Sequence, residues 1–302
     1  MRPDLVVVGA GPAGVMAALL ARWQGLSVTL IEASASPGGQ LHRVYGALTG
    51  VPGYSGAGAG LAVLLARQLE EGGIEWRGGC EASALESAGE GVRVAQASGG
   101  GVVARAALIA TGLRNRTLGV PGERELAGRG VSTSGTRDRE RVTGRRVVVV
   151  GGGDAAFENA LILAATGCAV TLISRGVPRA RPRFRQRVAA EPRIERLEGG
   201  RVTAILGTAA VEGVRVAGAS GERVLPAEAV FVKIGQLPNT EWCRNAVACD
   251  ADGYLCVDGN GATSQAAVWA AGDVTRPPVP TVAAASAGAT YAVTAIRKAL
   301  QG

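Results

Sequence analysis

The sequence is poor in the residues that metal sites and disulfide frameworks need. It holds a single histidine, His42, and no Cys-x-x-Cys pair. Scattered sulfurs and one imidazole support neither a zinc site nor a disulfide framework, so we expect no bound metal. The five cysteines are Cys80, Cys168, Cys243, Cys249 and Cys256.

Long apolar runs and aromatic residues are also scarce. No uninterrupted run approaches the roughly twenty apolar residues of a transmembrane helix, and the N-terminal apolar stretch lacks a charged leader. We therefore expect a cytoplasmic protein with no membrane partner. Aromatic residues make up 4% of the chain and no nucleic-acid-binding module is recognisable, so the net charge of +7 does not predict a nucleic-acid partner.

Glycine, in contrast, is abundant, and two glycine clusters form similar motifs. They are Gly9-Ala10-Gly11-Pro12-Ala13-Gly14 and Gly151-Gly152-Gly153-Asp154-Ala155-Ala156. Each follows an apolar, strand-like run, at residues 4–8 and 146–150, and precedes a helix-like run. In a dinucleotide fingerprint the first glycine makes a tight turn, the second admits a pyrophosphate and the third position must be small. The 302 residues therefore predict two dinucleotide sites in an α/β fold of two domains.

The two motifs differ in the residue that ends the following strand. After the first, a helix at 13–24 leads to a strand at 27–31 that ends in Glu32, an acid suited to a ribose hydroxyl. The bland alternative for Glu32 is a solvated strand end. A long Gly/Pro-rich segment, residues 37–60, then precedes a helix at 61–71, and irregular stretches of such length are usually functional.

The second motif leads to a helix at 154–166 and a strand at 169–173 that ends in Ser174 and Arg175, with no acid. Serine and arginine favour a 2′-phosphate, so we expect NADP(H), with NAD(H) as the alternative. Residues 175–187 hold six arginines, of which at least one is expected to clamp that phosphate, and most of the others form a solvated basic face. Near the C-terminus, an apolar run at 267–273 delivers Asp273 to the ligand-binding end of a strand.

Together these pieces, in this order, resemble the low-molecular-weight thioredoxin reductases. The resemblance covers nearly the whole chain and implies two Rossmann-like, three-layer ββα domains in a homodimer. An FAD-binding domain would comprise residues 1–114 and 236–302, with an NAD(P)H-binding domain, residues 115–235, inserted. Further matching motifs are Gly38-Gly39-Gln40-Leu41, Ala110-Thr111-Gly112, residues 118–123, residues 128–132, residues 234–240 and Ala271-Gly272-Asp273-Val274.

The resemblance also implies the residues that hold each cofactor. For FAD they are Gly9, Gly11, Pro12, Ala13, Gly14, Glu32, Ala33, Gly39, Gln40, Leu41, Ala82, Ala110, Thr111, Gly112, Gly272, Asp273 and Val282. For NADP(H) they are Gly151, Gly153, Asp154, Ala155, Ala156, Ser174, Arg175, Arg179 and Arg181.

One departure from the family's pattern concerns the chemistry itself. Thioredoxin reductases carry a Cys-x-x-Cys disulfide where this chain has Ser134-Gly135-Thr136-Arg137. Neither a hydroxyl nor a guanidinium can take part in thiol–disulfide exchange, so the chain is not expected to reduce thioredoxin by the family's route. Two smaller departures affect the flavin's surroundings. Gly50 stands where the family usually has an asparagine, and Pro280-Thr281 or Thr281-Val282, depending on the alignment, stands where it has Arg-Gln.

We therefore predict an FAD-dependent NAD(P)H oxidoreductase that passes electrons from flavin directly to an external acceptor. The acceptor would be a ferredoxin- or flavodoxin-like carrier, a quinone, oxygen or a small molecule, and the arginine-rich stretch would suit an acidic carrier. A second hypothesis is a tailoring flavoprotein with a small molecule beside the flavin, in which His42 transfers a proton and Ser134, Thr136 and Arg137 line the space. A third is a non-catalytic redox sensor.

Overall fold

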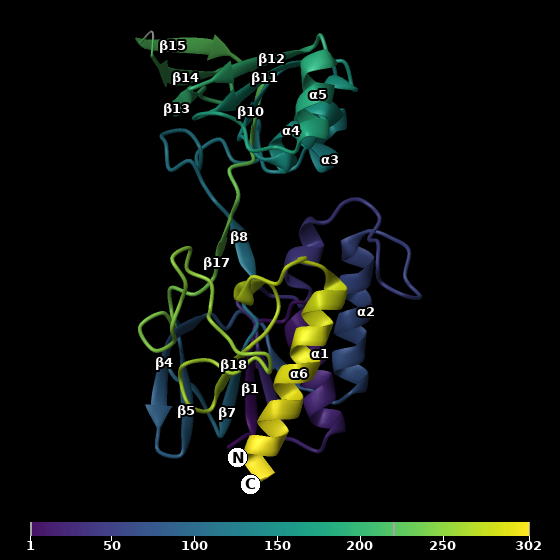
Figure 1. The fold of residues 1–302 in the computed structure, drawn as a ribbon, viewed down its shortest axis with the longest axis vertical. Helices are drawn as coiled ribbons and strands as arrows, with labels where there is room; N and C mark the ends of the chain where they lie inside the picture. Colours follow the sequence, from purple (N-terminus) through teal and green to yellow (C-terminus); the bar gives the residue numbers. More distant parts are fainter. Residues whose placement is uncertain (1, 220, 302) are drawn as a thin grey trace. The chain divides into compact units, whose positions relative to one another are not determined.

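The chain folds into two compact units, which are drawn in the computed structural model of Figure 1. Residues 2–219 and 221–301 are described. One unit comprises Met1–Arg114 and Leu237–Gly302, and the other comprises Asn115–Gln236. The chain crosses between them twice, in β8 (Leu113–Asn115) and β17 (Gln236–Pro238), which pair as a two-stranded sheet.

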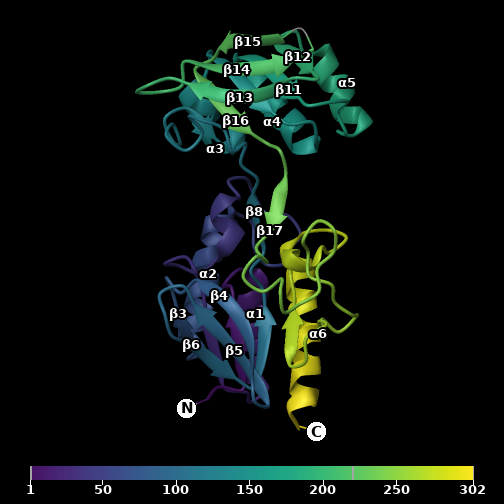
Figure 2. The same ribbon diagram turned by 90° about the vertical axis from the view of Figure 1, so that its left-hand side faces the viewer.

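The first unit has three layers, which can be followed in Figures 1 and 2. A parallel five-stranded sheet, in the order β18-β7-β1-β2-β3, forms the centre. Helices α1 and α6 pack on one face and the antiparallel sheet β4-β5-β6 on the other. The elements are β1 (Leu5–Val8), α1 (Pro12–Trp23), β2 (Val28–Ile31), η1 (Gly39–Arg43), α2 (Gly58–Glu71), β3 (Glu75–Arg77), β4 (Ala82–Ala88), β5 (Gly91–Gln96), β6 (Gly101–Ala104), β7 (Ala106–Ile109), β18 (Val268–Ala270), η3 (Asp273–Thr275) and α6 (Val282–Gln301).

The second unit repeats this plan. Its parallel sheet has the order β12-β11-β10-β16-β9, with α4 and α5 on one face and the antiparallel sheet β13-β14-β15 on the other. The elements are β9 (Val131–Ser132), α3 (Gly135–Asp138), η2 (Arg139–Val142), β10 (Arg146–Val150), α4 (Asp154–Ala164), β11 (Ala169–Ser174), α5 (Pro182–Ala190), β12 (Ile194–Glu198), β13 (Arg201–Leu206), β14 (Gly213–Gly218), β15 (Gly221–Pro226) and β16 (Ala229–Val232). The predicted fold class of two three-layer Rossmann-like domains is confirmed.

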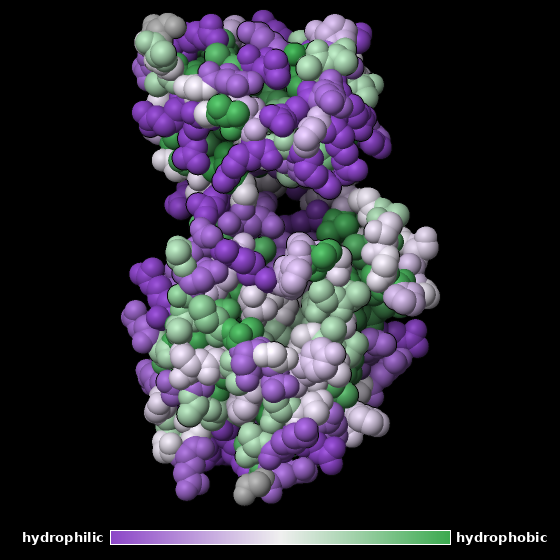
Figure 3. Space-filling view, viewed as in Figure 1, coloured by the Kyte–Doolittle hydropathy of each residue, from purple (hydrophilic) through white to green (hydrophobic). Residues whose placement is uncertain are grey.

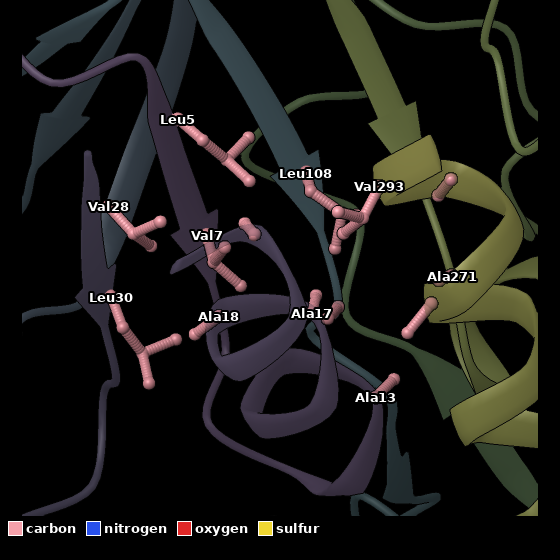
Figure 4. Close-up of a cluster of buried hydrophobic side chains, with 14 of the residues drawn as sticks. Leu5, Val7, Ala13, Ala17, Ala18, Val28, Leu30, Leu108, Ala271 and Val293 are labelled. Atoms are coloured by element: carbon pink, nitrogen blue, oxygen red, sulfur yellow. The ribbon is translucent and has the colours of Figure 1, made fainter. Parts of the chain in front are cut away.

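Small side chains let the layers of the first unit approach closely. Strand β1 is buried on both faces, as expected for the centre of a parallel sheet. Figure 4 shows Val7 of β1 near Ala17 and Ala18 of α1, with Leu5 further along the same strand. Alanines also dominate the buried face of α6, and α1 and α6 are in extensive contact. The sheet and its helices therefore form a tightly packed core next to the first glycine motif.

Among the described residues, no helix is long and apolar enough to cross a membrane. The same residues contain no group of three or more His, Cys, Asp or Glu side chains placed to hold a metal ion.

The core of the second unit yields a stability prediction. Phe157 of α4 is fully buried against the parallel sheet. Replacing Phe157 with Ala removes this packing and leaves a cavity, so we expect the free energy of unfolding of this unit to fall by about 3–5 kcal/mol. Urea denaturation followed by circular dichroism measures the change. Val224→Ala, at a side chain 55% exposed in β15, is the control and should change the free energy of unfolding by less than about 0.5 kcal/mol. Equal losses in the two variants would contradict the placement of Phe157 in the core.

Candidate functional site: two dinucleotide cradles

The first glycine motif turns the chain sharply between β1 and α1. Gly9 has φ +103°, and a Cβ there would lie 2.5 Å from the carbonyl oxygen of Ala110. A Cβ on Gly14 would lie 1.8 Å from the carbonyl oxygen of Gly9, so only glycine fits either position. Gly11 differs, because no other atom of the described residues lies within 4 Å of its notional Cβ. The open space at Gly11 adjoins the N-terminus of α1, which no side chain caps.

The second motif has the same construction between β10 and α4. Gly151 has φ +149°, and its Cβ would lie 2.1 Å from the carbonyl oxygen of Lys233. The third position here is Ala156, which is fully buried. Gly153 again has nothing within 4 Å of its notional Cβ, and it precedes α4 without a side-chain cap. An uncapped helix N-terminus beside open space suits a pyrophosphate, so both turns fit a dinucleotide.

Glu32 is bound to the first motif and is not a solvated strand end. Its side chain is buried, and its carboxylate accepts two backbone hydrogen bonds, from Ala10 at 2.6 Å and from Ser34 at 2.9 Å. The alternative interpretation of Glu32 as a solvated strand end is therefore wrong. The carboxylate holds the end of β2 against the turn where the adenosine side of a dinucleotide would lie, while the ribose contact itself stays a prediction.

Two segments far apart in the sequence meet beside the first motif. The amide Nε2 of Gln40 in η1 donates to Oδ2 of Asp273 in η3 at 2.9 Å. Burial raises the pKa of Asp273, and the Gln40 hydrogen bond opposes that effect. A Cβ on Gly39 would lie 3.1 Å from Cα of Gly11, and one on Gly272 would lie 2.8 Å from the Cβ of Ala13. Both ends of the chain thus converge on one cradle.

The other residues predicted for FAD occupy four different settings. Ala110, Thr111 and Gly112 follow β7 directly, where Ala110 backs onto Gly9. Ala82 begins β4 and packs against the core on the opposite face of the sheet. Leu41 and Val282 pack together with α2, and Ala33 is exposed.

In the second unit, the loop after β11 folds back onto the glycine motif. The backbone N–H groups of Arg179 and Ala180 both donate to the carbonyl of Gly152, at 2.7 and 3.0 Å. Ser174 is buried, and its hydroxyl donates to the carbonyl of Gly176 at 2.8 Å. The loop that carries the predicted clamp residues therefore packs against the second glycine motif, while binding of a 2′-phosphate by these residues stays a prediction.

One of these predicted clamp residues is already paired with an acid. The backbone N–H of Arg181 donates to Oδ1 of Asp154 at 2.7 Å, and its guanidinium forms an ion pair with Oδ2 of the same carboxylate. Sequence reasoning placed both residues at the cofactor but missed their pairing. The sequence signal for this ion pair was Asp154, an acid at the first position of α4 that a nearby arginine can bind. Arg175 and Arg179 are exposed and form no ion pair within the described chain.

Residues 134–137, the segment that the resemblance aligns with the dithiol, form a polar cluster with Ser132 and Asp138. The Ser134 hydroxyl accepts a hydrogen bond from the backbone N–H of Arg137, capping α3. The Arg137 guanidinium binds both carboxylate oxygens of Asp138, at 2.9 and 2.6 Å, and the Ser132 hydroxyl donates to Asp138 at 2.6 Å. Burial raises the pKa of Asp138, but the bonds from Arg137 and Ser132 outweigh it and the net pKa is lowered. Ser134 and Arg137, which the resemblance aligns with the two cysteines, therefore belong to a charged, hydrogen-bonded cluster.

The surroundings of three cysteines, Cys168, Cys243 and Cys249, do not favour disulfide exchange. Burial raises the pKa of Cys243 to about 12, and burial also raises the pKa of Cys249. Cys168 is buried and its Sγ donates to the carbonyl of Val142 at 2.9 Å. Because the thiolate is the nucleophile in disulfide exchange, these groups are poorly suited to replace the missing pair.

His42 has a backbone partner that accounts for its position. Its Nε2 donates to the carbonyl of Pro37 at 2.8 Å, across the tight turn at Gly38, where φ is +121°. The ring is exposed and holds this turn closed. This geometry favours a structural function for His42 over proton transfer.

The polar cluster yields a pH-dependent prediction. In Arg137→Met, burial of Asp138 is no longer offset by the guanidinium, so its pKa rises. The wild-type pair stabilises the protein above the ordinary carboxyl range and loses that contribution as pH falls through the lowered pKa of Asp138. We therefore expect the free energy of unfolding of the variant to be about 1–2 kcal/mol lower than that of the wild type at neutral pH, a value that allows for solvent screening of the half-exposed arginine. This difference should shrink in acid.

Chemical denaturation at several pH values measures this difference. Arg141→Met is the control, because Arg141 lies 3.9 Å from Asp138 and is 80% exposed. A deficit in Arg137→Met that stays constant down to acid pH would show that the pair is not responsible.

Comparison with known proteins agrees with this geometry. A protein-family profile described as pyridine nucleotide-disulphide oxidoreductase matches residues 3–289. The F subunit of alkyl hydroperoxide reductase from Pseudomonas putida is 34% identical over 281 residues, covering 91% of this chain and 54% of that protein. The chain thus spans about half the length of such relatives. Thioredoxin reductase of Listeria monocytogenes is 31% identical over 280 residues, covering 90% of this chain and 85% of that protein.

Comparison with solved structures indicates the same family. Lactococcus lactis thioredoxin reductase matches with a TM-score of 0.83 and 26% identity, covering 98% of each chain. T. acidophilum thioredoxin reductase matches with a TM-score of 0.81 and 28% identity, covering 100% of this chain and 99% of that one. The family binds FAD and NAD(P)H. With two intact dinucleotide cradles and a match along nearly its whole length, the chain belongs to the pyridine nucleotide-disulphide oxidoreductase family, in its low-molecular-weight thioredoxin reductase-like branch.

Proposed function

We propose that this protein is an FAD-dependent NADPH oxidoreductase that passes electrons from flavin to an external acceptor without a protein dithiol. The observation that carries the proposal is the combination of two complete cradles with the Ser134 and Arg137 pair in place of two sulfurs. The protein keeps what is needed for electrons to enter. It lacks the family's exit route.

FAD fits the first unit. The open space at Gly11 and the uncapped start of α1 would hold the pyrophosphate, and Glu32 would bind the adenosine ribose. Gln40 and Asp273 would contact the flavin end, because they meet beside the same turn. When bound, FAD supplies the acceptor for a hydride and releases electrons singly or in pairs.

The second unit suits NADPH better than NADH. Its strand β11 ends at Ser174 and Arg175 follows, so no carboxylate stands at this strand end to repel a 2′-phosphate. Arg175 and Arg179 carry free positive charge at the edge of the cradle, whereas Arg181 is paired with Asp154. By analogy with the family, which is typically homodimeric, we infer a homodimer in solution.

Electrons would leave the flavin directly. Disulfide exchange requires a thiolate, and the cluster of Arg137, Asp138 and Ser132 offers none. The Arg137–Asp138 pair instead places two charged groups that cannot be oxidised or reduced beside the position aligned with the dithiol. The hypothesis of a tailoring enzyme with His42 as the acid–base group gains no support, because that ring is bound to Pro37.

The test is a stopped-flow experiment on the FAD-reconstituted protein. Under anaerobic conditions NADPH should bleach the oxidised-flavin absorbance within the time of one turnover, and NADH at least about tenfold more slowly, the effect of roughly 1.4 kcal/mol from a 2′-phosphate contact. A neutral benzoquinone should reoxidise the flavin, whereas thioredoxin and an aromatic disulfide should not. Failure of NADPH to bleach the flavin would reject the function.

A cysteine-free variant is the matched control for the missing exit route. It replaces the buried Cys168 and Cys243 with Ala, and Cys80, Cys249 and Cys256 with Ser. Because no thiol takes part, NADPH–quinone turnover should stay within about twofold of wild type. Loss of turnover in a variant that still folds and binds FAD would show that a cysteine carries the electrons.

A further inference from the structure

The positive charge of the protein is concentrated in one unit. The unit Asn115–Gln236 contains 20 of the 32 Lys and Arg residues and 12 of the 25 Asp and Glu residues, a net charge of +8. The other unit carries the remaining 12 basic and 13 acidic residues, a net charge of −1. An asymmetry of this size between two units of one chain points to a negatively charged partner of the basic unit.

Within that unit the charge is most one-sided at α5. No acidic residue occurs between Glu158 and Glu191, a stretch that includes six arginines. Of these six, only Arg181 forms an ion pair with an acid in the described chain. On the antiparallel sheet of the same unit, by comparison, Arg215 is 3.9 Å from Glu222. Figure 3 shows hydrophilic residues over the α5 side of this unit.

An apolar hollow of about 260 Å³ lies between α4 and α5. Leu161, Ile162, Ala165 and Phe184 line the hollow, and Arg187 and Glu158 complete its lining. Leu161 and Ile162 are only partly buried. Apolar side chains thus stay accessible beside the guanidinium of Arg187 and the carboxylate of Glu158.

Two arginines lie over the aromatic ring that lines the hollow. The guanidinium carbons of Arg181 and Arg183 lie 5.4 and 5.0 Å from the centroid of the Phe184 ring. Such contacts stabilise a cation on an aromatic face. An apolar centre with a polar, arginine-rich rim is the usual anatomy of a protein interface.

We propose that the α4–α5 hollow and its arginine rim are the docking site for an acidic electron-carrier protein, which inserts one apolar side chain into the hollow. The proposal rests on the proposed function, which requires an external acceptor. Charge complementarity selects an acidic partner. The apolar lining, with the carboxylate of Glu158 beside it, favours a protein surface over a phosphate polymer, because phosphates would be repelled by Glu158 and gain nothing from the apolar residues.

The test compares three variants with the wild type, using an acidic bacterial flavodoxin as the carrier. Arg187→Glu reverses a charge at the hollow, and Arg187→Lys retains the charge. Arg223→Glu is the matched control, because Arg223 is exposed in β15 of the same unit and its replacement makes the same change in net charge. None of these residues belongs to either cradle. The readouts are flavodoxin binding by calorimetry and kcat/KM for NADPH-driven flavodoxin reduction.

For the wild type, kcat/KM for flavodoxin should fall steadily as salt is added, since screening weakens association of opposite charges. Arg187→Glu should lower kcat/KM about tenfold, and Arg223→Glu less than about twofold. Arg187→Lys should retain most of the activity. A fourth variant, Ala165→Trp, which fills the hollow without changing charge, should weaken flavodoxin binding as well. Turnover with a neutral quinone should be unchanged in all four variants.

Three results would overturn the docking proposal while leaving the proposed function intact. One is flavodoxin reduction that is insensitive to salt. A second is equal loss in Arg187→Glu and Arg223→Glu, which would show a diffuse charge effect. The third is that duplex DNA binds with the expected Arg187 dependence while flavodoxin neither binds nor is reduced, and quinone turnover continues. Failure of NADPH to bleach the flavin in the wild type would instead reject the proposed function itself.

Discussion

Both units depend on one steric constraint, the close approach of a glycine to the chain that follows a neighbouring strand. Gly9 faces the carbonyl of Ala110 after β7, and Gly151 faces the carbonyl of Lys233 after β16, each at a distance that excludes a Cβ. Because the chain can turn there, the next helix starts directly above the end of the sheet. Its N-terminus is uncapped and borders open space, which makes it available to a pyrophosphate.

The two cradles share a backbone plan and differ in the charges around it. Glu32 brings a buried carboxylate to the first turn, and Ser174 takes the equivalent strand-end position in the second unit. The two units also differ in net charge, since one is nearly neutral and the other is strongly basic. The proposed order of electron flow, from NADPH in the basic unit to FAD in the neutral one, follows from these local differences and not from the fold, which the two units have in common.

Features that depend on local sequence could be predicted. The strand expected at 146–150 is β10 (Arg146–Val150), and the helix expected at 13–24 is α1 (Pro12–Trp23), because apolar runs bounded by glycine turns leave few alternatives. The strand expected at 267–273 is shorter, β18 (Val268–Ala270), since the chain turns at Gly272. Contacts between distant residues could not be predicted. Gln40 and Asp273 are 233 positions apart, and the Asp154–Arg181 pair and the α4–α5 hollow exist only once helices are packed.

If electrons enter and leave through flavin alone, the oxidised holoprotein stores one electron pair per FAD. Anaerobic titration with NADPH tests this central claim most directly, because it counts the electron pairs that the protein can store. One equivalent of NADPH per FAD should bleach the flavin absorbance fully, with no further uptake. A requirement for two equivalents, with the first consumed before the flavin bleaches, would reveal a redox-active disulfide and contradict the claim.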